Sequence, residues 1–336
     1  MRVAVLVEPG RIEMEERPIP SPAPGDVLVR VSAVGVCGSD THYYRHGRVG
    51  GFVVDGPLVL GHEAAGTVVA TGDGVDPARI GERVSIEPQR PDPDSEETRR
   101  GDYNLCPHMQ FFGTPPVDGA FCEYVTIGAP FAHPVPGTVS DEAAALCEPL
   151  SVGIAAIRKA RIGGGARILI AGAGPIGIVL TQVARAFGAE EIVASDPDEA
   201  RRKRAIDFGA TAVIDPVAED PGELGGPGFD AFIDASGAPK AVDAGIRAVR
   251  PAGTVVLVGS GAESMSLPTQ VIQNRELVLT GIFRYANTWP TAISLIESGR
   301  VDLDAMVTAR FPLEMAAHAL DSDRVPGTVK SVVTVS

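Results

Sequence analysis

Four side chains in the first half of the chain have the types needed to hold a metal ion. Cys37 lies in GVCGSDTHYY, His62 and Glu63 lie in GHE, and Glu148 lies in CEPLS. Thiolate, imidazole and carboxylate donors together are typical of a zinc site that leaves one position open. Residue types alone leave other roles open, because cysteines in β-rich turns, His-Glu pairs and glutamates near helix starts also serve packing and ion pairing.

A glycine motif further along the chain indicates a dinucleotide site. Residues 167–188 read RILIAGAGPIGIVLTQVARAFG, a β-branched run followed by a glycine turn and an apolar helical pattern. In this G-x-G-x-x-G arrangement the turn admits no side chain, and free N–H groups at the helix start face a pyrophosphate. The residues expected at the cofactor are Gly172, Gly174, Pro175, Ile176 and Gly177.

An acidic residue after the next strand predicts which dinucleotide is bound. Asp196 follows the apolar run 191–195 and lies 24 residues after Gly172. A carboxylate at this place binds the adenosine ribose 2′-hydroxyl and repels a 2′-phosphate, so NAD is favoured over NADP. Arg201, also expected at the cofactor, leaves the choice open because a nearby arginine can accept the phosphate.

The composition limits the classes of function. The 336-residue chain is long enough for two domains, and it carries a formal net charge of −14. This charge argues against nucleic acid and anionic membranes as partners, and the apolar runs are broken before the ~20 residues of a membrane span. We see no secretion signal, and the four irregularly spaced cysteines do not suggest a disulfide framework. A reducing, cytoplasmic setting is therefore expected.

Residues 1–147 are rich in strand-like runs and poor in helical patterns. Pro, Gly and Asp turns separate these runs, which predicts an all-β, barrel-like module with long loops. The runs are Val3–Val7, Val27–Val31, Ala65–Ala70, Arg83–Ile86 and Phe121–Thr126. The stretch 87–106 is polar, and we expect it to form a solvated lobe.

Strand and helix patterns alternate over 148–284, which predicts a doubly wound parallel sheet with the glycine motif on its first strand. The six predicted strands are 167–171, 191–195, 211–214, 230–234, 253–258 and 277–282. The tail, 285–336, is expected to pack back on the first module through helices near 288–298 and 313–321 and a strand at 328–335. The dinucleotide domain is then an insertion, and the active site is expected between the two lobes.

Several motifs along the whole chain resemble one known family. GVCGSDTHYY, LGHEAAGTV, AGAGPIG and FRYANTWP are similar to the zinc-dependent medium-chain dehydrogenases. FFGTPP, CEPLSVG and FRYANTWP resemble the sorbitol (polyol) dehydrogenase branch in particular. The resemblance implies an α/β protein of two domains, a GroES-like β-rich catalytic domain (1–147 plus 285–336) and a six-stranded Rossmann domain (148–284).

The resemblance also implies roles for the candidate residues. Zinc is expected at Cys37, His62 and Glu63, with Glu148 reaching it directly or through water. Ser39 matches the relay hydroxyl and His42 the terminal relay position, which passes the proton on through the cofactor ribose, although a turn serine and a surface histidine are the alternatives. The residues that match polyol-contacting positions are Tyr43, Phe111, Thr114, Glu148, Arg284 and Tyr285. Glu63 and Glu148 count among the catalytic residues, and Asp40 is expected to orient its neighbours.

One departure from the family concerns a second, structural zinc that many relatives hold with four cysteines. At the matching positions this chain has Asp92, Ser95, Thr98 and Cys106. One thiolate cannot hold a closed tetrahedral site, so the structural zinc is predicted to be absent. Cys147, next to Glu148, is interpreted as a small buried residue, although it could in principle replace that ligand.

The leading interpretation is a zinc- and NAD-dependent polyol dehydrogenase that oxidises a secondary alcohol to a ketose. A bound metal can lower the pKa of a hydroxyl by roughly nine units, which outweighs a positioned acid or base. The alternatives are a sugar-acid, threonine-type or simple secondary alcohol dehydrogenase, or a non-catalytic NAD-binding regulatory protein. The apolar edge expected at 277–282 suggests a homo-oligomer, either a dimer or a tetramer.

Overall fold

The chain divides into two compact units. The computed structural model describes residues 1–224, 226–261 and 263–335. The first unit comprises Met1–Glu148 and Trp289–Ser336, and the second comprises Pro149–Thr288. These limits lie one and four residues beyond the expected domain boundaries at 147 and 284. The tail from Trp289 onward is part of the first unit.

The first unit is built on mostly antiparallel sheets, in which β19 and β20 form a parallel pair. Its main sheet has the order β12-β8-β7-β3-β20-β19, and β11 also pairs with β3. Strand β20 of the tail runs antiparallel to β3, so the two distant segments of this unit share one sheet. The strands are β1 (Arg2–Glu8), β2 (Arg11–Glu16), β3 (Asp26–Gly35), β4 (Arg48–Val49), β5 (Phe52–Val53), β6 (Leu58–Val59), β7 (Glu63–Thr71), β8 (Arg83–Ile86), β9 (Gln89–Arg90), β10 (Gln110–Phe111), β11 (Tyr124–Gly128), β12 (Ala132–Pro134), β19 (Val307–Pro312) and β20 (Lys330–Thr334).

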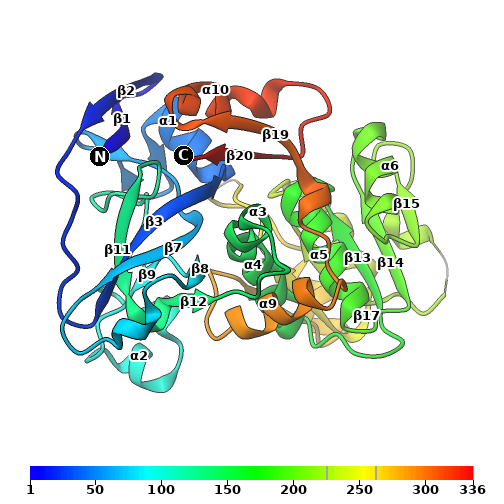
Figure 1. The fold of residues 1–336 in the computed structure, drawn as a ribbon. Coiled ribbons are helices and arrows are strands. Elements are labelled where there is room, and N and C mark those ends of the chain that lie inside the picture. Colours follow the sequence, from blue (N-terminus) through cyan, green and yellow to red (C-terminus); the bar gives the residue numbers. More distant parts are fainter. Residues whose placement is uncertain (225, 262, 336) are drawn as a thin grey trace. The chain divides into compact units, whose positions relative to one another are not determined.

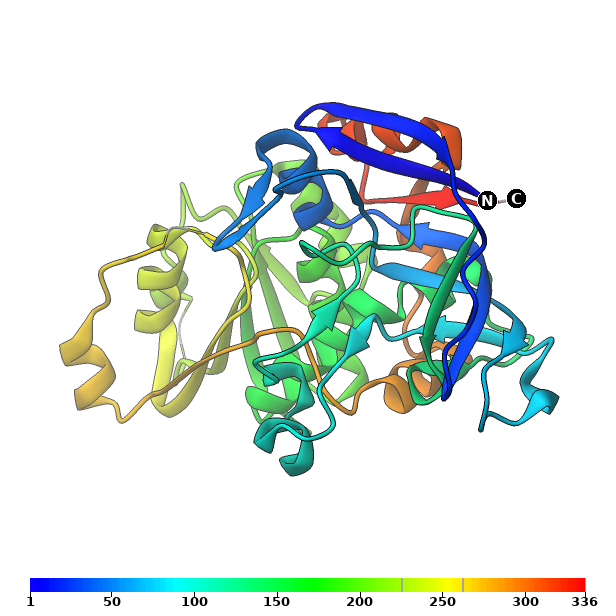
Figure 2. The ribbon, with the colours of Figure 1, turned by 90° about the vertical axis from the view of Figure 1, so that its left-hand side faces the viewer.

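Burial explains why these segments are strands. Strand β3 reads DVLVRVSAVG and is buried along most of its length, as expected for the central strand of a sheet covered on both faces. By contrast, β2 reads RIEMEE, is largely exposed, and pairs only with β1. Figure 2 shows the hairpin of β1 and β2 lying along the tail helix α10 (Ala316–Asp321), which contacts β2.

The second unit is a doubly wound parallel sheet (Figure 1). Its order is β15-β14-β13-β16-β17-β18, and every neighbouring pair is parallel. The strands are β13 (Arg167–Ala171), β14 (Glu191–Ser195), β15 (Ala212–Ile214), β16 (Phe229–Asp234), β17 (Val249–Leu257) and β18 (Val278–Gly281). The first strand, β13, lies where the strand order reverses, which is where such sheets bind ligands. The predicted fold class is therefore confirmed.

The helices complete both units. The first unit contains α1 (Gly38–His46), α2 (Glu96–Arg100), α3 (Asp141–Ala145), α9 (Trp289–Glu297) and α10, and α4 (Cys147–Lys159) begins in it. The second unit contains α5 (Pro175–Ala186), α6 (Glu199–Asp207), α7 (Pro239–Ala248) and α8 (Thr269–Asn274). Among the described residues, no helix combines the length and apolar character that crossing a membrane requires.

Helix α1 and strand β19 are among the elements that were not expected from the sequence. Helix α1 lies in a module predicted to be poor in helices, because its polar sequence GSDTHYYRH has no apolar period. Its limits are instead set by Asp40, which accepts a hydrogen bond from the Cys37 N–H, and by Gly47 in the left-handed conformation (φ 67°) at the C-terminal end. Strand β19 was also missed, and the helix predicted at 313–321 is a 3₁₀ turn (Leu313–Met315) followed by α10.

We expect Gly245 to be indispensable for packing in the second unit. An added Cβ would overlap the ring of Phe232, which is fully buried on β16. Overpacking of this kind costs about 1–3 kcal/mol, whereas a helical Gly→Ala change without the clash would gain about 0.5–1 kcal/mol. Thermal unfolding should therefore show a lower Tm for Gly245→Ala. Adding Phe232→Leu should recover part of that loss, and two independent, additive losses would contradict the interpretation.

Candidate metal centre and active site

Cys37, His62 and Glu63 meet in the first unit. One ligand atom from each lies within 4.8 Å of the others, and theirs is the one such group of three or more His, Cys, Asp or Glu side chains in the described part of the chain. Cys37 is the N-cap of α1, where the helix N-terminus favours negative charge. His62 and Glu63 lie at the beginning of β7. Three of the four predicted ligands are thus brought together.

The pairing of β3 with β7 creates this arrangement. Glu63, the first residue of β7, lies opposite Gly35, the last residue of β3. A Cβ at position 35 would overlap the Glu63 Oε2 atom, so only glycine leaves room for the carboxylate. Cys37 follows two residues later and therefore lies beside Glu63. The sequence analysis overlooked Gly35 because its role depends on the residue across the sheet.

Asp40 connects the cysteine and histidine segments. It is fully buried; its carboxylate accepts hydrogen bonds from the Cys37 N–H and the Gly61 N–H, both at 3.0 Å, and lies 3.4 Å from His62 Nδ1. Burial raises the pKa of Asp40, but the neighbouring His62 and the two N–H groups lower it by more than burial raises it, so the net shift is downward. Asp40 thus contacts both segments, and its role in orienting its neighbours stays a prediction.

Lys330 completes the site from the far end of the chain. Its ammonium group donates to Glu63 Oε1 at 2.6 Å and to the Val36 carbonyl at 2.8 Å, and the side chain is 4% exposed. Burial lowers the pKa of Lys330, but the charges of Glu63 and Cys37 raise it above its ordinary value. We had not identified this lysine. The sequence feature that could have indicated it is a lysine at the beginning of the strand KSVVT, whose other residues are uncharged.

The arrangement fits a divalent cation. The second carboxylate oxygen of Glu63, Oε2, is buried and has no hydrogen-bond partner among the described residues, which is costly unless a cation faces it. Burial lowers the pKa of His62, but the charges of Asp40 and Cys37 raise it well above its ordinary value. The surroundings of this imidazole therefore attract positive charge. Thiolate, imidazole and carboxylate together suit zinc.

Glu148 and Cys147 differ in their relation to this group. Glu148 lies in the first turn of α4, is 5% exposed and helps to raise the pKa of Lys330, so its charge acts on the same region. It is not one of the three residues that approach within 4.8 Å of one another. Burial raises the pKa of the Cys147 thiol to about 12, as expected for a small buried residue without a ligand role.

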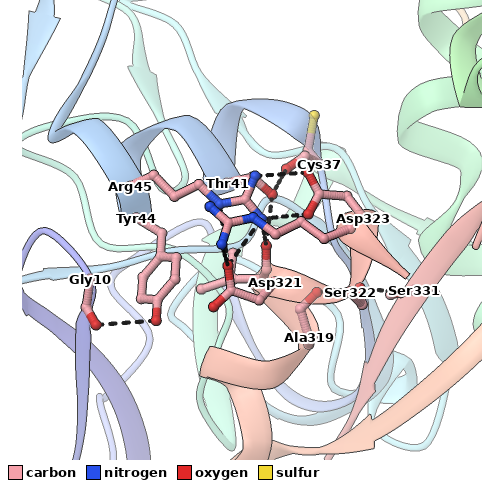
Figure 3. A network of polar contacts seen from close by, with 12 residues as sticks. Gly10, Cys37, Thr41, Tyr44, Arg45, Ala319, Asp321, Ser322, Asp323 and Ser331 are labelled. Atoms are coloured by element: carbon pink, nitrogen blue, oxygen red, sulfur yellow. Dashed lines mark hydrogen bonds and ion pairs between the residues drawn. The ribbon is translucent and has the colours of Figure 1, made fainter. Parts of the chain in front are cut away.

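Helix α1 carries both predicted relay residues and is firmly anchored. Ser39 is half-buried and His42 is exposed. The helix is fixed by Arg45, which forms ion pairs with Asp321 and Asp323 (Figure 3). In the same network Thr41 donates to the Leu320 carbonyl and Tyr44 to the Gly10 carbonyl. The segment that follows Cys37 is thereby held in place.

Apart from Glu148, the substrate-side candidates are distributed over both units. In the first unit the Phe111 ring lies 5.5 Å from the His62 ring, measured between centroids, whereas Tyr43 is buried in α1 and Thr114 lies in the turn after Phe111. In the second unit Tyr285 is buried. Arg284 has a positive φ of 56° and its guanidinium lies over the Phe283 ring.

The four residues at the structural-zinc positions lie close together, and Cys106 is the one that carries sulfur. Cys106 Sγ accepts a hydrogen bond from the Asp92 N–H at 3.3 Å, and the Ser95 and Thr98 hydroxyls are 2.9 Å apart. Burial raises the pKa of Cys106, but hydrogen bonds from Ser95, Asp92, His108 and Thr98 outweigh this and lower it. These side chains thus form hydrogen bonds with one another and with the backbone at the positions that match the zinc ligands of relatives. The absence of a structural zinc stays a prediction.

The glycine turn has the geometry of a dinucleotide site. Gly172 has a φ of 93°, and a Cβ on Gly177 would overlap the Gly172 carbonyl. Pro175 begins α5 and Ile176 follows it. Asp196 is 4% exposed and accepts a hydrogen bond from the Ala173 N–H at 2.9 Å, so the acid is held beside the turn. The exposed guanidinium of Arg201 lies 3.9 Å from Asp196 Oδ2.

Known proteins resemble the chain along nearly its whole length. One family model, described as the alcohol dehydrogenase GroES-like domain, matches residues 23–137, and another, described as zinc-binding dehydrogenase, matches residues 175–298. Sorbitol dehydrogenase from Macaca fascicularis is 44% identical over 325 residues, which cover 95% of this chain and 91% of the relative. This chain belongs to the zinc-dependent medium-chain dehydrogenases, in their sorbitol dehydrogenase branch.

Solved structures of this superfamily agree closely. L-idonate 5-dehydrogenase from Escherichia coli has a TM-score of 0.93 at 29% identity, covering 99% of this chain and 97% of that one. A short chain alcohol dehydrogenase from Escherichia coli, complexed with the cofactor NADH, has a TM-score of 0.93 at 28% identity and covers 99% of each chain. The predicted family is confirmed, and the chain is a polyol-type dehydrogenase that uses zinc and a nicotinamide dinucleotide.

The stability of the dehydrogenase against unfolding should depend most strongly on Lys330 when its zinc has been removed. Replacing one partner of a buried ion pair costs about 3–5 kcal/mol, because the other charge is left uncompensated. In Lys330→Met we expect that loss in the chelator-treated protein and a smaller loss in the zinc-loaded protein, where a metal still faces Glu63.

Denaturant unfolding with and without chelator measures the difference. Lys240→Met, a change at an exposed lysine of α7, should leave both unfolding free energies unchanged and serves as the control. An equal loss of unfolding free energy in the chelator-treated and the zinc-loaded protein would show that Lys330 and the metal do not both interact with Glu63.

Proposed function

We propose that this dehydrogenase oxidises a secondary alcohol of a polyol, such as sorbitol or xylitol, to a ketose with NAD. The observation that carries the proposal is the group of Cys37, His62 and Glu63, in which the buried Glu63 Oε2 atom has no hydrogen-bond partner. A non-catalytic NAD-binding protein would have no use for such an uncompensated carboxylate. The proposal therefore favours catalysis over a regulatory role.

The proposed mechanism assigns the metal to Cys37, His62 and Glu63, with Glu148 as a ligand directly or through water. When bound, zinc supplies a Lewis acid that polarises the substrate hydroxyl, and the nicotinamide ring supplies the hydride acceptor. Asp40 holds His62 and the Cys37 backbone in fixed positions relative to each other. Lys330 holds Glu63 Oε1, which leaves Oε2 directed at the metal position.

The substrate proton leaves through α1 in this proposal. Ser39 Oγ takes the proton from the alcohol and passes it on toward the His42 imidazole. The exposure of His42 supports this role, because the last residue of a proton path must exchange with solvent. Anchoring of α1 through Arg45 keeps both relay residues at fixed positions.

Polar and aromatic side chains recognise the substrate in the proposal. A chain of hydroxyls needs several donors and acceptors around a largely aromatic pocket. Phe111 packs near His62, and Tyr43, Thr114 and Tyr285 supply hydroxyls. Arg284 supplies a cation from a left-handed backbone conformation, and strained residues of this kind cluster at functional sites.

A sugar acid is the second candidate substrate. Arg284 suits a carboxylate as well as a hydroxyl, and the solved L-idonate 5-dehydrogenase has nearly the same fold. Threonine-type and simple secondary alcohol substrates are also included in the test panel.

We also propose that the enzyme works as a homo-oligomer in a reducing, cytoplasmic setting, without nucleic acid or membrane partners. Strand β18 is an edge of the Rossmann sheet, and Val278 on it is 41% exposed, which suits pairing with a second subunit. All four cysteines are free, which suits a reducing compartment.

Metal analysis combined with a substrate panel tests the proposed function. Protein purified without chelator should contain about one zinc per chain and reduce NAD⁺ with polyols faster than with sugar acids, threonine or simple alcohols. Cys37→Ser should lose the zinc and the turnover, because a three-residue ligand set loses its thiolate.

Cys106→Ser, the matched control, should keep both. Two zincs per chain, one of which is lost in Cys106→Ser, would show that the 87–106 lobe binds metal after all. A folded protein that binds NADH but has neither zinc nor turnover would overturn the dehydrogenase proposal in favour of the regulatory one.

The preference for NAD should depend on the charge of Asp196. In Asp196→Ser the ribose loses hydrogen bonds to a carboxylate, worth about 1.5–3 kcal/mol, so kcat/KM for NAD⁺ should fall by about 10–100-fold. Activity with NADP⁺ should rise, because the repulsion is removed and Arg201 is exposed. Adding Arg201→Ala should cancel that rise. An unchanged ratio of NAD⁺ to NADP⁺ activity would contradict the assignment of Asp196.

A further inference from the structure

Two histidines lie one helical turn apart on the exposed face of α1. His42 and His46 are separated by four residues, their ring centroids are 5.7 Å apart, and both side chains are exposed. Within the described residues, neither imidazole forms a hydrogen bond or an ion pair with the protein. The proposed relay gives His42 a role. His46 belongs neither to the relay nor to the zinc ligands.

The helix holds the two imidazoles at a spacing that a metal ion can bridge. Side chains at i and i+4 have Cβ atoms about 5–6 Å apart, and two nitrogens on one tetrahedral zinc are separated by roughly 3.3 Å at Zn–N bonds of about 2.0–2.1 Å. Exposed histidines can reach that separation by rotating their side chains. The backbone of α1 need not move, because contacts of Thr41, Tyr44 and Arg45 anchor the helix.

The local charges favour a cation at this position. His46 lies in the last turn of α1, where the helix dipole places partial negative charge. The positive charge of Arg45 on the same helix is compensated by Asp321 and Asp323. Arg48, which follows the helix, is the remaining cation of this segment, and its guanidinium donates to the Gly50 carbonyl.

We propose that His42 and His46 form a second, surface metal site that takes a divalent transition-metal ion through two imidazoles and water. Imidazole pairs suit zinc, copper and nickel. A metal ion on His42 occupies the nitrogen lone pair that must accept the substrate proton. Excess zinc therefore inhibits turnover from a site separate from the Cys37–His62–Glu63 group. The binding claim stands on the helix alone, whereas the inhibition rests on the proposed relay role of His42.

Zinc titration of the enzyme with its tight zinc already bound tests the proposal. Isothermal titration at about pH 8, without chelating buffer, should show one further Zn²⁺ per chain in the unaltered enzyme. His46→Gln removes one of two ligands, so its affinity for this ion should fall about tenfold or more, since the chelate is lost. The zinc concentration that halves polyol oxidation should rise by the same factor, while activity without added zinc stays unchanged.

His318→Gln provides the matched control, because His318 is a single exposed histidine on α10. This change should alter neither the binding nor the inhibition. If His46→Gln binds the second zinc as tightly as the unaltered enzyme, the paired site is overturned. If the second zinc binds but polyol oxidation is unaffected, the inhibition claim is overturned together with the relay role of His42. The binding result decides the metal site even if no polyol is turned over.

Discussion

The first unit depends on one buried carboxylate. Glu63 is fully buried at the beginning of β7, and a charge in that position is costly unless it is paired. Lys330 neutralises one carboxylate oxygen, and the other remains unpartnered. The chain thus keeps a half-compensated charge in its interior. A further cation facing the free oxygen stabilises such an arrangement, so the preference for metal follows from the same residue that shapes the site.

That requirement also explains the order of the segments along the chain. Glu63 and its partner Lys330 are 267 residues apart, and the lysine comes from the last strand, β20, which pairs with β3. The metal site is therefore complete only after the tail has joined the first sheet. The parallel sheet of the second unit lies between these two segments in the sequence, and its contacts are mostly its own. Non-local pairing of this kind is slow to form, so the site belongs to the late steps of folding.

The sequence predicted the elements whose signals are local and missed those that depend on distant partners. The glycine turn, Asp196 and the strands 167–171 and 191–195 follow from residues within one short segment. Cys37, His62 and Glu63 were found because their types are chemically distinctive. Gly35 was missed because it matters only opposite Glu63, and Lys330 because its partner is in another strand. The polar helix α1 was missed because its ends and its anchors, not an apolar period, determine it.

Helix α1 combines requirements that oppose one another. Its first residues lie beside the metal group and must be rigid, which the ion pairs of Arg45 and the buried Tyr44 provide. In the proposed mechanism the His42 side chain must also remain open, because a histidine that releases protons has to contact solvent. An open, unprotonated imidazole is also a metal ligand, and a second histidine one turn away turns it into a chelate. The exposure that suits His42 for proton release therefore also makes it accessible to metal ions, and the helical spacing of His46 determines how strongly they compete.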